Sequence, residues 1–527
     1  MKKALVFFIF LTSLSKIYSQ ELPIIWGEPQ KSSGSLIDIL PKNTRDFVTL
    51  RWSGGNTFGS YKLNNFADLT FLEEKKMKLR TQSGIGTFET SYFFGNKTCV
   101  FLSDFANSRM MIFLQKYDEY LEPEDEPIFM ADYENRKFNA QPNFQIVKSN
   151  NNKFISIFWQ IPGKSSTSDA YGYKIFDANF NEVQAGEYAL PFDGNLTIIT
   201  NYHLTNNGEC LISLTEFIKP VDRLFINNNS NFKAVHVYKL KNNILKEFSL
   251  ELDGLRIDNM QLGSNDSSSY SLIGIYAKGN FNKSLGVFSL LIDAQKDSLS
   301  SSAFIPLTSV SANDSWSDND QNNRQSFGRM INSYNPDVYT YKLRDVFTLN
   351  DGSILGSIEQ YYMYRRVSQD SRTGASSSVN YYYYDDIIAF KINEKSILNW
   401  EKRIKKSQVS INDQGAYSSY SSFYTDSSFC FIFNDNATNY DEFGYYSREN
   451  SNPQSTNFSR QRNTSAICQI NKKDGVYSRK ILLDKKELNA LIVPKAFKLD
   501  IANQELLLYA LQGYKEKFGI IKLNLKK

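Results

Sequence analysis

The feature that most constrains this chain is a short apolar strand that recurs eight times, each time after a turn rich in Asn, Asp, Gly or Ser. The eight strands are Phe47–Trp52, Cys99–Leu102, Lys153–Trp159, Glu209–Leu214, Tyr270–Tyr276, Ser353–Ile358, Ser428–Phe433 and Glu505–Leu511. Recurrence of one supersecondary unit at a long period is the signature of a repeat architecture. It constrains the architecture much more tightly than the chemistry.

Each recurring strand belongs to a larger unit of four strands, which we call a, b, c and d. The recurring strand is b, and an alternating strand c follows it, as in Ile112–Tyr117 or Tyr171–Phe176. Apolar residues at every second position indicate one buried face. Strand a precedes b, as in Phe88–Phe94, and strand d follows c, as in Val183–Leu190. The unit repeats without long helical periodicity.

This pattern predicts an all-β fold, an eight-bladed β-propeller of four-stranded antiparallel blades; seven blades is the alternative. The last repeat ends with strand c, Phe518–Leu523, and has no strand d of its own. The segment Leu22–Glu28 is otherwise unassigned, so we expect it to pair with this last strand. Such pairing removes an exposed sheet edge and closes the ring.

The uneven spacing of the repeats indicates where the working surface lies. Turns between a and b and between c and d are short and share one face of the ring. The long segments are Gln360–Asn380 and Asn434–Asn463, between b and c, and Thr308–Pro336, between d and a. All three are expected on the opposite face, and long loops gathered on one face of a rigid scaffold commonly carry binding.

One of these segments is bracketed by tyrosines and arginines, the residue types enriched at interface hot spots. The candidate ligand-binding residues are Tyr361, Tyr362, Tyr364, Arg365, Arg366, Tyr381 and Tyr382. Stacking on a sugar or a peptide would use the same chemistry. The alternative interpretation is that alternate tyrosines only cover the flanks of the strands.

Other motifs favour structural roles. The segment Asn313–Asp320 carries carboxylates that suit Ca²⁺, yet it lacks the Gly and the terminal Glu of an EF-hand loop, so a solvated loop is favoured. The two histidines, His203 and His236, belong to strands a and c of one blade with strand b between them. With only these two histidines, a His-rich zinc site or a Ser-His-Asp triad is not favoured. No metal, cofactor or catalytic residue is predicted.

The N-terminus reads as a secretory signal over residues 1–19, with Lys2 and Lys3 before the apolar run Ala4–Leu14. Residues 20–527 then form a single propeller domain, exported to the periplasm or the outside, without a membrane span. The net charge of +4 is small for a chain of 527 residues and does not indicate nucleic-acid binding. We expect a monomer.

Four cysteines in an exported chain raise the question of disulfides. Cys99 and Cys210 occupy equivalent positions in different repeats and are interpreted as buried small apolar side chains. Cys430 and Cys468 fall in neighbouring strands of one repeat, so a bridge between them stays open.

The C-terminal third resembles a group of exported Bacteroidota proteins of unknown function. The residues that carry the likeness are Tyr384–Asn393, Trp400–Lys402, Phe431–Asn436, Asn503–Tyr509 and Phe518–Lys522. They are strand and turn residues, so the resemblance implies a scaffold and no reaction.

The sequence thus favours a non-enzymatic exported propeller that recognises a protein or glycan partner through its long-loop face. The alternative is a glycan-directed hydrolase with carboxylates in the central channel, because Asp and Glu are abundant and their spatial separation is not readable from the sequence.

Overall fold

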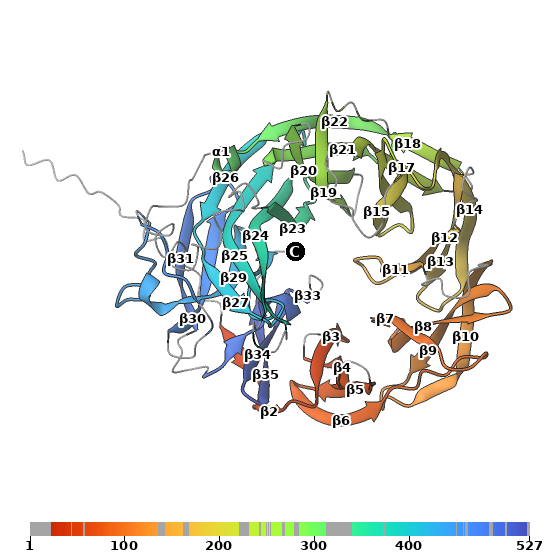
Figure 1. Ribbon diagram of the computed structural model, residues 1–527, viewed down its shortest axis with the longest axis horizontal. Helices are drawn as coiled ribbons and strands as arrows, with labels where there is room; N and C mark the ends of the chain where they lie inside the picture. Colours follow the sequence, from red (N-terminus) through yellow and green to blue (C-terminus); the bar gives the residue numbers. More distant parts are fainter. Residues whose placement is uncertain are drawn as a thin grey trace, which may run out of the picture.

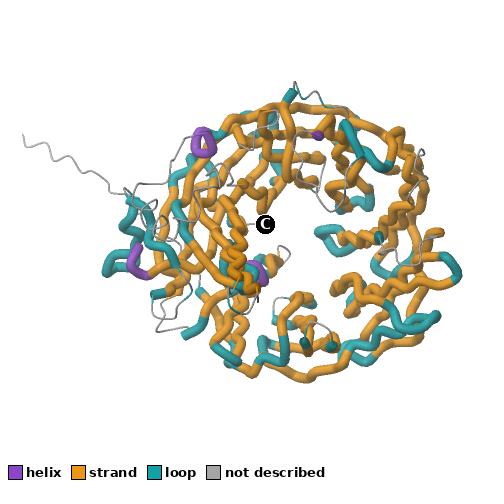
Figure 2. The backbone as a smooth tube through the Cα atoms, in the orientation of Figure 1, coloured by secondary structure: helices purple, strands orange, loops and turns teal. Residues whose placement is uncertain are grey.

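Eight antiparallel sheets stand side by side around a common axis in the computed structural model (Figure 1). The structure describes residues 23–523 except for 44, 56–57, 135–142, 162–167, 221–230, 242–243, 249, 251, 253, 266–268, 279–283, 312–339, 370–371, 373–375, 450, 457, 459–461, 484–488 and 501–502. Strands make up nearly all of the ring (Figure 2). The predicted signal segment and the polar segment Asn313–Asp320 lie outside the described residues.

The first four blades each contain four strands in chain order. Their strands are β3 (Ser35–Pro41), β4 (Phe47–Gly54), β5 (Gly59–Ala67) and β6 (Thr70–Lys76); β7 (Thr87–Phe94), β8 (Lys97–Ala106), β9 (Arg109–Tyr117) and β10 (Pro123–Glu134); β11 (Phe144–Lys148), β12 (Phe154–Ile161), β13 (Ser168–Asp177) and β14 (Glu182–Asp193); and β15 (Thr197–Leu204), β16 (Cys210–Phe217), β17 (Phe232–Lys241) and β18 (Ile244–Phe248).

Blades 5 to 7 follow the same order. They comprise β19 (Leu255–Ser264), β20 (Ser269–Lys278), β21 (Ser284–Asp293) and β22 (Ser298–Pro306); β23 (Thr340–Thr348), β24 (Ile354–Gln369), β25 (Ser376–Ile392) and β26 (Leu398–Ile404), with β27 (Gln408–Ile411) beside β25; and β28 (Ser421–Tyr424), β29 (Ser428–Asn436), β30 (Asn463–Asn471) and β31 (Tyr477–Leu483). A short helix, α1 (Thr308–Ser311), follows blade 5, and η3 (Ala437–Asn439) lies in blade 7.

Blade 8 is built from both ends of the chain. It contains β32 (Leu491–Ile492), the 3-10 helix η4 (Pro494–Ala496), β33 (Lys498–Asp500), β34 (Glu505–Gln512) and β35 (Lys515–Lys522), and β1 (Ile24–Trp26) and β2 (Gln30–Lys31) complete it. Strand β1 pairs with β35 in antiparallel register, Ile24 opposite Ile521 and Trp26 opposite Gly519. The predicted eight blades and the pairing of the N-terminal segment with the last strand are both present.

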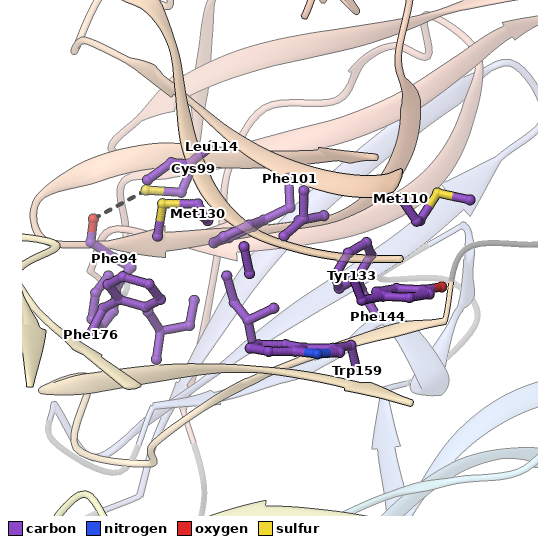
Figure 3. Close-up of a cluster of buried hydrophobic side chains, with 14 residues drawn as sticks. Phe94, Cys99, Phe101, Met110, Leu114, Met130, Tyr133, Phe144, Trp159 and Phe176 are labelled. Carbon is purple, nitrogen blue, oxygen red and sulfur yellow. Dashed lines mark hydrogen bonds between the residues drawn. The ribbon is translucent and has the colours of Figure 1, made fainter. Parts of the chain in front are cut away.

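The core lies between neighbouring blades. Every predicted b strand coincides with the observed second strand of its blade, although Lys153, Glu209 and Ser353 lie one residue before the strands that were predicted to begin with them. Strand β16 is buried along its whole length. Figure 3 shows the layer between blades 2 and 3, where Phe101 and Met130 of one blade face Trp159 and Phe176 of the next. Buried strands of this kind explain the continuous apolar runs that made the repeat visible in the sequence.

All four cysteines are free and buried. Phe431, not Cys430, is the register partner of Cys468, so the two neighbouring thiols point to opposite faces of their sheet. Cys430 accordingly packs toward blade 8 and Cys468 toward blade 6. Burial raises the pKa of Cys468 and Cys99 to about 12, which fits small apolar side chains in the core.

Candidate functional site

The prediction that Gln360–Asn380 is a loop is wrong, because most of this segment continues the two central strands of blade 6. Strand β24 runs to Gln369 and β25 begins at Ser376, with paired residues from Tyr361–Tyr384 out to Gln369–Ser376. β-branched and aromatic residues favour extended pairing over a loop. We call the paired segment beyond Gln360 the arm.

The arm carries the candidate tyrosines on both of its faces. Side chains alternate along a strand, and directly paired residues share a face. One face, which we call the front face, continues the side of blade 6 that bears Glu359. It carries Tyr361, Met363 and Arg365 of β24 with Tyr382 and Tyr384 of β25. The opposite back face carries Tyr362, Tyr364 and Arg366 with Tyr381 and Tyr383.

Cross-strand ring contacts support this division. The ring centroids of Tyr361 and Tyr384 are 4.9 Å apart, and those of Tyr364 and Tyr381 are 6.2 Å apart. The structure therefore brings Tyr361, Arg365 and Tyr382 to the front face and the other four candidate residues to the back face. The seven residues do not form a single pocket, since a sheet separates the two groups.

Three cations that the sequence did not single out surround the base of the front face. Lys342 and Arg344 come from β23, the innermost strand of blade 6 (Figure 1), and Lys495 comes from η4 of blade 8. The Lys342 ammonium is 3.9 Å from the centroid of the Tyr361 ring. The Lys495 ammonium donates a hydrogen bond of 2.9 Å to the Tyr384 hydroxyl. We call Lys342, Arg344 and Lys495 the inner cationic cluster.

A β-bulge positions Arg344. The register of β23 and β24 shifts between Leu343 and Asp345, so Arg344 has no direct partner on β24. Bulges redirect single side chains and bend the strand. The same shift occurs in the innermost strand of blades 1, 2, 4 and 5. Among these five described bulges, only the one in blade 6 carries an arginine at the bulged position.

A buried carboxylate lies beneath the cluster. Glu359 accepts hydrogen bonds from Lys406 at 3.0 Å, from Arg344 at 2.7 Å and from the Ser419 hydroxyl at 2.8 Å. Burial opposes its ionisation, but the charges of Lys406 and Arg344 lower the pKa of Glu359 below its ordinary value. Glu359 is thus an ionised, fully bonded group that joins blades 6 and 7.

Near Glu359 lies a second carboxyl group, that of Asp345, whose pKa is raised instead of lowered. Burial raises the pKa of Asp345 to about 6, against the hydrogen bond from Ser422 and the charge of Arg344. Two carboxyl groups whose environments separate their pKa values are the arrangement that acid–base catalysis uses.

The other long insertion described, between β29 and β30, is held by buried contacts. Asp435 forms an ion pair with Arg479 and accepts a hydrogen bond of 2.6 Å from the Tyr440 hydroxyl. Asp441 accepts backbone hydrogen bonds within its own turn. These carboxylates stabilise the insertion, and in the described part of the chain no cluster of His, Cys, Asp and Glu has the geometry of a metal site.

The histidines lie apart, as predicted. His203 on β15 contacts the Ser264 hydroxyl at 2.8 Å, and burial lowers its pKa to about 4. His236 on β17 contacts Glu247 at 2.7 Å and Glu216 at 3.2 Å. These three contacts are within or between neighbouring blades and support structural roles. Over the residues described, no helix is long and apolar enough to cross a membrane.

No family model and no curated protein matches the sequence. Among solved structures, the WD40 domain of SCAP from fission yeast is similar with a TM-score of 0.38 at 10% identity, covering 96% of this chain and 98% of that chain. An ulvan lyase has a TM-score of 0.32 at 10% identity, covering 80% of this chain and 91% of its own. An acylaminoacyl peptidase from Pyrococcus horikoshii has a TM-score of 0.32 at 7% identity, covering 76% and 57%. The propeller assignment rests on the strand topology described above, and no activity is transferred from these structures.

Proposed function

We propose that this protein is an exported, monomeric, non-enzymatic propeller that binds a protein or glycan through the face that carries the arm. The observation that supports the proposal is the arm itself. It extends the two central strands of one blade beyond the core, exposes Arg365, Arg366 and Met363, which is 49% exposed, and carries half-buried tyrosines beside them. A rigid scaffold with one such extension is a common way to present a binding surface.

Deleting Val367–Val379 tests the proposal. The deletion removes the outer part of the arm and leaves the blade core intact, so thermal unfolding of the variant should match that of the full chain. Capture of partners from a polysaccharide panel and from an envelope-protein fraction should be lost. Unchanged capture would exclude the outer part of the arm as the binding element.

A point variant gives a sharper comparison. Tyr382→Ala removes one aromatic ring from the front face of the arm and should weaken capture. Ile397→Ala is the matched control, because Ile397 is also exposed, at 57%, but lies in the short turn between β25 and β26 on the other face of the ring. Equal losses in both variants would indicate general destabilisation instead of a binding role.

The second candidate function is a glycan-directed hydrolase, in which Asp345 on the innermost strand of blade 6, with its pKa raised to about 6, would supply the general acid. A screen of polysaccharides and aryl glycosides from about pH 4 to 8 tests it. Turnover that disappears in Asp345→Asn would establish this function, whereas turnover of none of them would remove its support.

A further inference from the structure

Two members of the inner cationic cluster, Lys342 and Lys495, form no direct ion pair with a described residue, although the charges of Glu359 and Asp413 act on Lys495 from a greater distance. Arg344 is bonded to Glu359, which also neutralises Lys406. Among the described residues, no carboxylate lies within ion-pair distance of Lys342 or Lys495. The Lys495 ammonium donates instead to the Tyr384 hydroxyl at 2.9 Å and to the Gly415 carbonyl at 2.7 Å.

The titration behaviour of the two lysines is consistent with this geometry. Burial lowers the pKa of Lys342, and the nearby charge of Arg344 lowers it further. Burial and Arg344 likewise lower the pKa of Lys495, to about 8. An incoming anion would relieve this repulsion between like charges.

The surface that adjoins the cluster is aromatic and polar. Along the front face, Tyr382 is the diagonal neighbour of Arg365, Asn380 is the paired residue of Arg365, and Tyr361 lies four residues earlier on the same strand. The aliphatic side chains Met363 and Val367 lie on either side of Arg365 and form no continuous patch. The centre of a protein–protein interface is typically apolar and depleted of lysine. A surface of phenol, amide and cationic groups suits a hydroxyl-rich anion better.

We infer that the front face of the arm binds an acidic glycan, with Lys342, Arg344 and Lys495 receiving a carboxylate or sulfate group of the sugar chain. This inference rests on the proposed function, because it names the ligand class of the same surface. The two ammonium groups supply charge-assisted hydrogen bonds, and the tyrosine rings of the front face lie beside the sugar chain.

The test uses the full chain and four polymers in solution at about physiological salt, where distant surface charges are largely screened. Polygalacturonate supplies carboxylates, dextran sulfate supplies sulfates, dextran is the neutral control and poly-L-glutamate is an acidic peptide. Calorimetric titration should show binding of polygalacturonate, dextran sulfate or both, with dextran and poly-L-glutamate much weaker. Preference for poly-L-glutamate, or equal binding of dextran, would overturn the inference.

The double variant Lys342→Gln/Lys495→Gln should bind the preferred acidic polymer about 10- to 100-fold more weakly, the loss expected for charge-assisted hydrogen bonds. Lys402→Gln is the matched control. Its ammonium also sits over a tyrosine, 4.1 Å from the centroid of Tyr477, but on the outermost strand of the blade, β26. Equal loss in the control would overturn the inference, because it would indicate binding by net charge alone.

The two proposals fail in different ways. If deletion of Val367–Val379 abolishes capture while the double lysine variant binds as the wild type does, the arm is the binding element and the inference of an acidic glycan is wrong. If the deletion and the double lysine variant both leave every interaction unchanged, the proposed function itself is wrong.

Discussion

At the scale of single residues, the most consequential contact is the buried ion pair between Arg51 of blade 1 and Glu516 of blade 8. The Arg51 guanidinium donates to both carboxylate oxygens, at 2.7 and 2.6 Å, and the side chains are 0% and 1% exposed. Tyr509 donates a further hydrogen bond to Glu516 at 3.0 Å. The pair therefore joins the first and last blades across the point where the ring closes.

Removing one partner leaves a buried charge uncompensated. We expect Arg51→Met to lower the free energy of unfolding by about 3–5 kcal/mol in chemical denaturation. The double variant Arg51→Met/Glu516→Leu should lose much less of the free energy of unfolding, because neither buried charge remains. The control is Lys75→Met, which breaks the exposed ion pair with Glu122 and should change stability by about 1 kcal/mol or less. A small effect of Arg51→Met would contradict the assigned role.

Lys495 gives the proposed glycan site a pH dependence. Its lowered pKa of about 8 means that the ammonium is charged at pH 7 and mostly neutral at pH 9. The charged groups that influence it are Arg344, Glu359, Asp413 and Lys406. Affinity for an acidic polysaccharide should therefore fall several-fold between pH 7 and 9, as titration at each pH would show. Lys495→Arg keeps its charge and should remove most of this decline. An equally steep decline in that variant would exclude Lys495 as its source.

At the scale of elements, the insertion between β29 and β30 depends on one side chain of β31. The Arg479 guanidinium lies 4.0 Å from the centroid of the Tyr446 ring, and its Nε donates to the Tyr440 hydroxyl at 2.8 Å. We expect Arg479→Lys to keep the charge but lose this planar packing, so that residues 437–462 become sensitive to protease while the ring persists. Mass spectrometry of the cleavage sites checks this. Arg403→Lys, on β26, should leave the insertion protected, and cleavage elsewhere would contradict the prediction.

The elements also indicate how far the sequence could be read. The b strands were readable because Phe429–Phe433 and its equivalents combine a polar turn with a fully buried apolar run. The arm was missed because most of its tyrosine-rich strands lie outside the core. No face of the arm is buried throughout, so its sequence lacks the alternation of apolar and polar residues that predicts a strand. The inner cationic cluster was not readable either. A bulge redirects Arg344, and the Lys495 ammonium reaches Tyr384 from blade 8, with blade 7 between the two in sequence. In the sequence, neither cation differs from a solvated surface residue.

At the scale of the whole molecule, closure joins the two ends of the chain in blade 8. Strand β1 pairs with β35, and the Gly27 N–H donates to the Phe518 carbonyl at 2.9 Å. Ile24 and Trp26 pack against the buried cluster between blades 7 and 8. A Cβ on Gly519 would come within 2.6 Å of the Trp26 ring, so this glycine admits the indole. Without β1, the edge of β35 is exposed as an unpaired strand.

Truncation measures what this closure contributes. A chain that begins at residue 23 retains β1 and should unfold at the same temperature as the longer chain. A chain that begins at residue 32 lacks β1 and β2, and the loss of the partly buried Trp26 alone should cost somewhat less than the roughly 3–5 kcal/mol of a core tryptophan. We expect a lower unfolding temperature and association through the open edge, which thermal melts and light scattering after size exclusion would detect. If the shorter chain stays monomeric with an unchanged melting temperature, the Arg51–Glu516 ion pair and blade packing suffice to close the ring, and β1 is not needed for its stability.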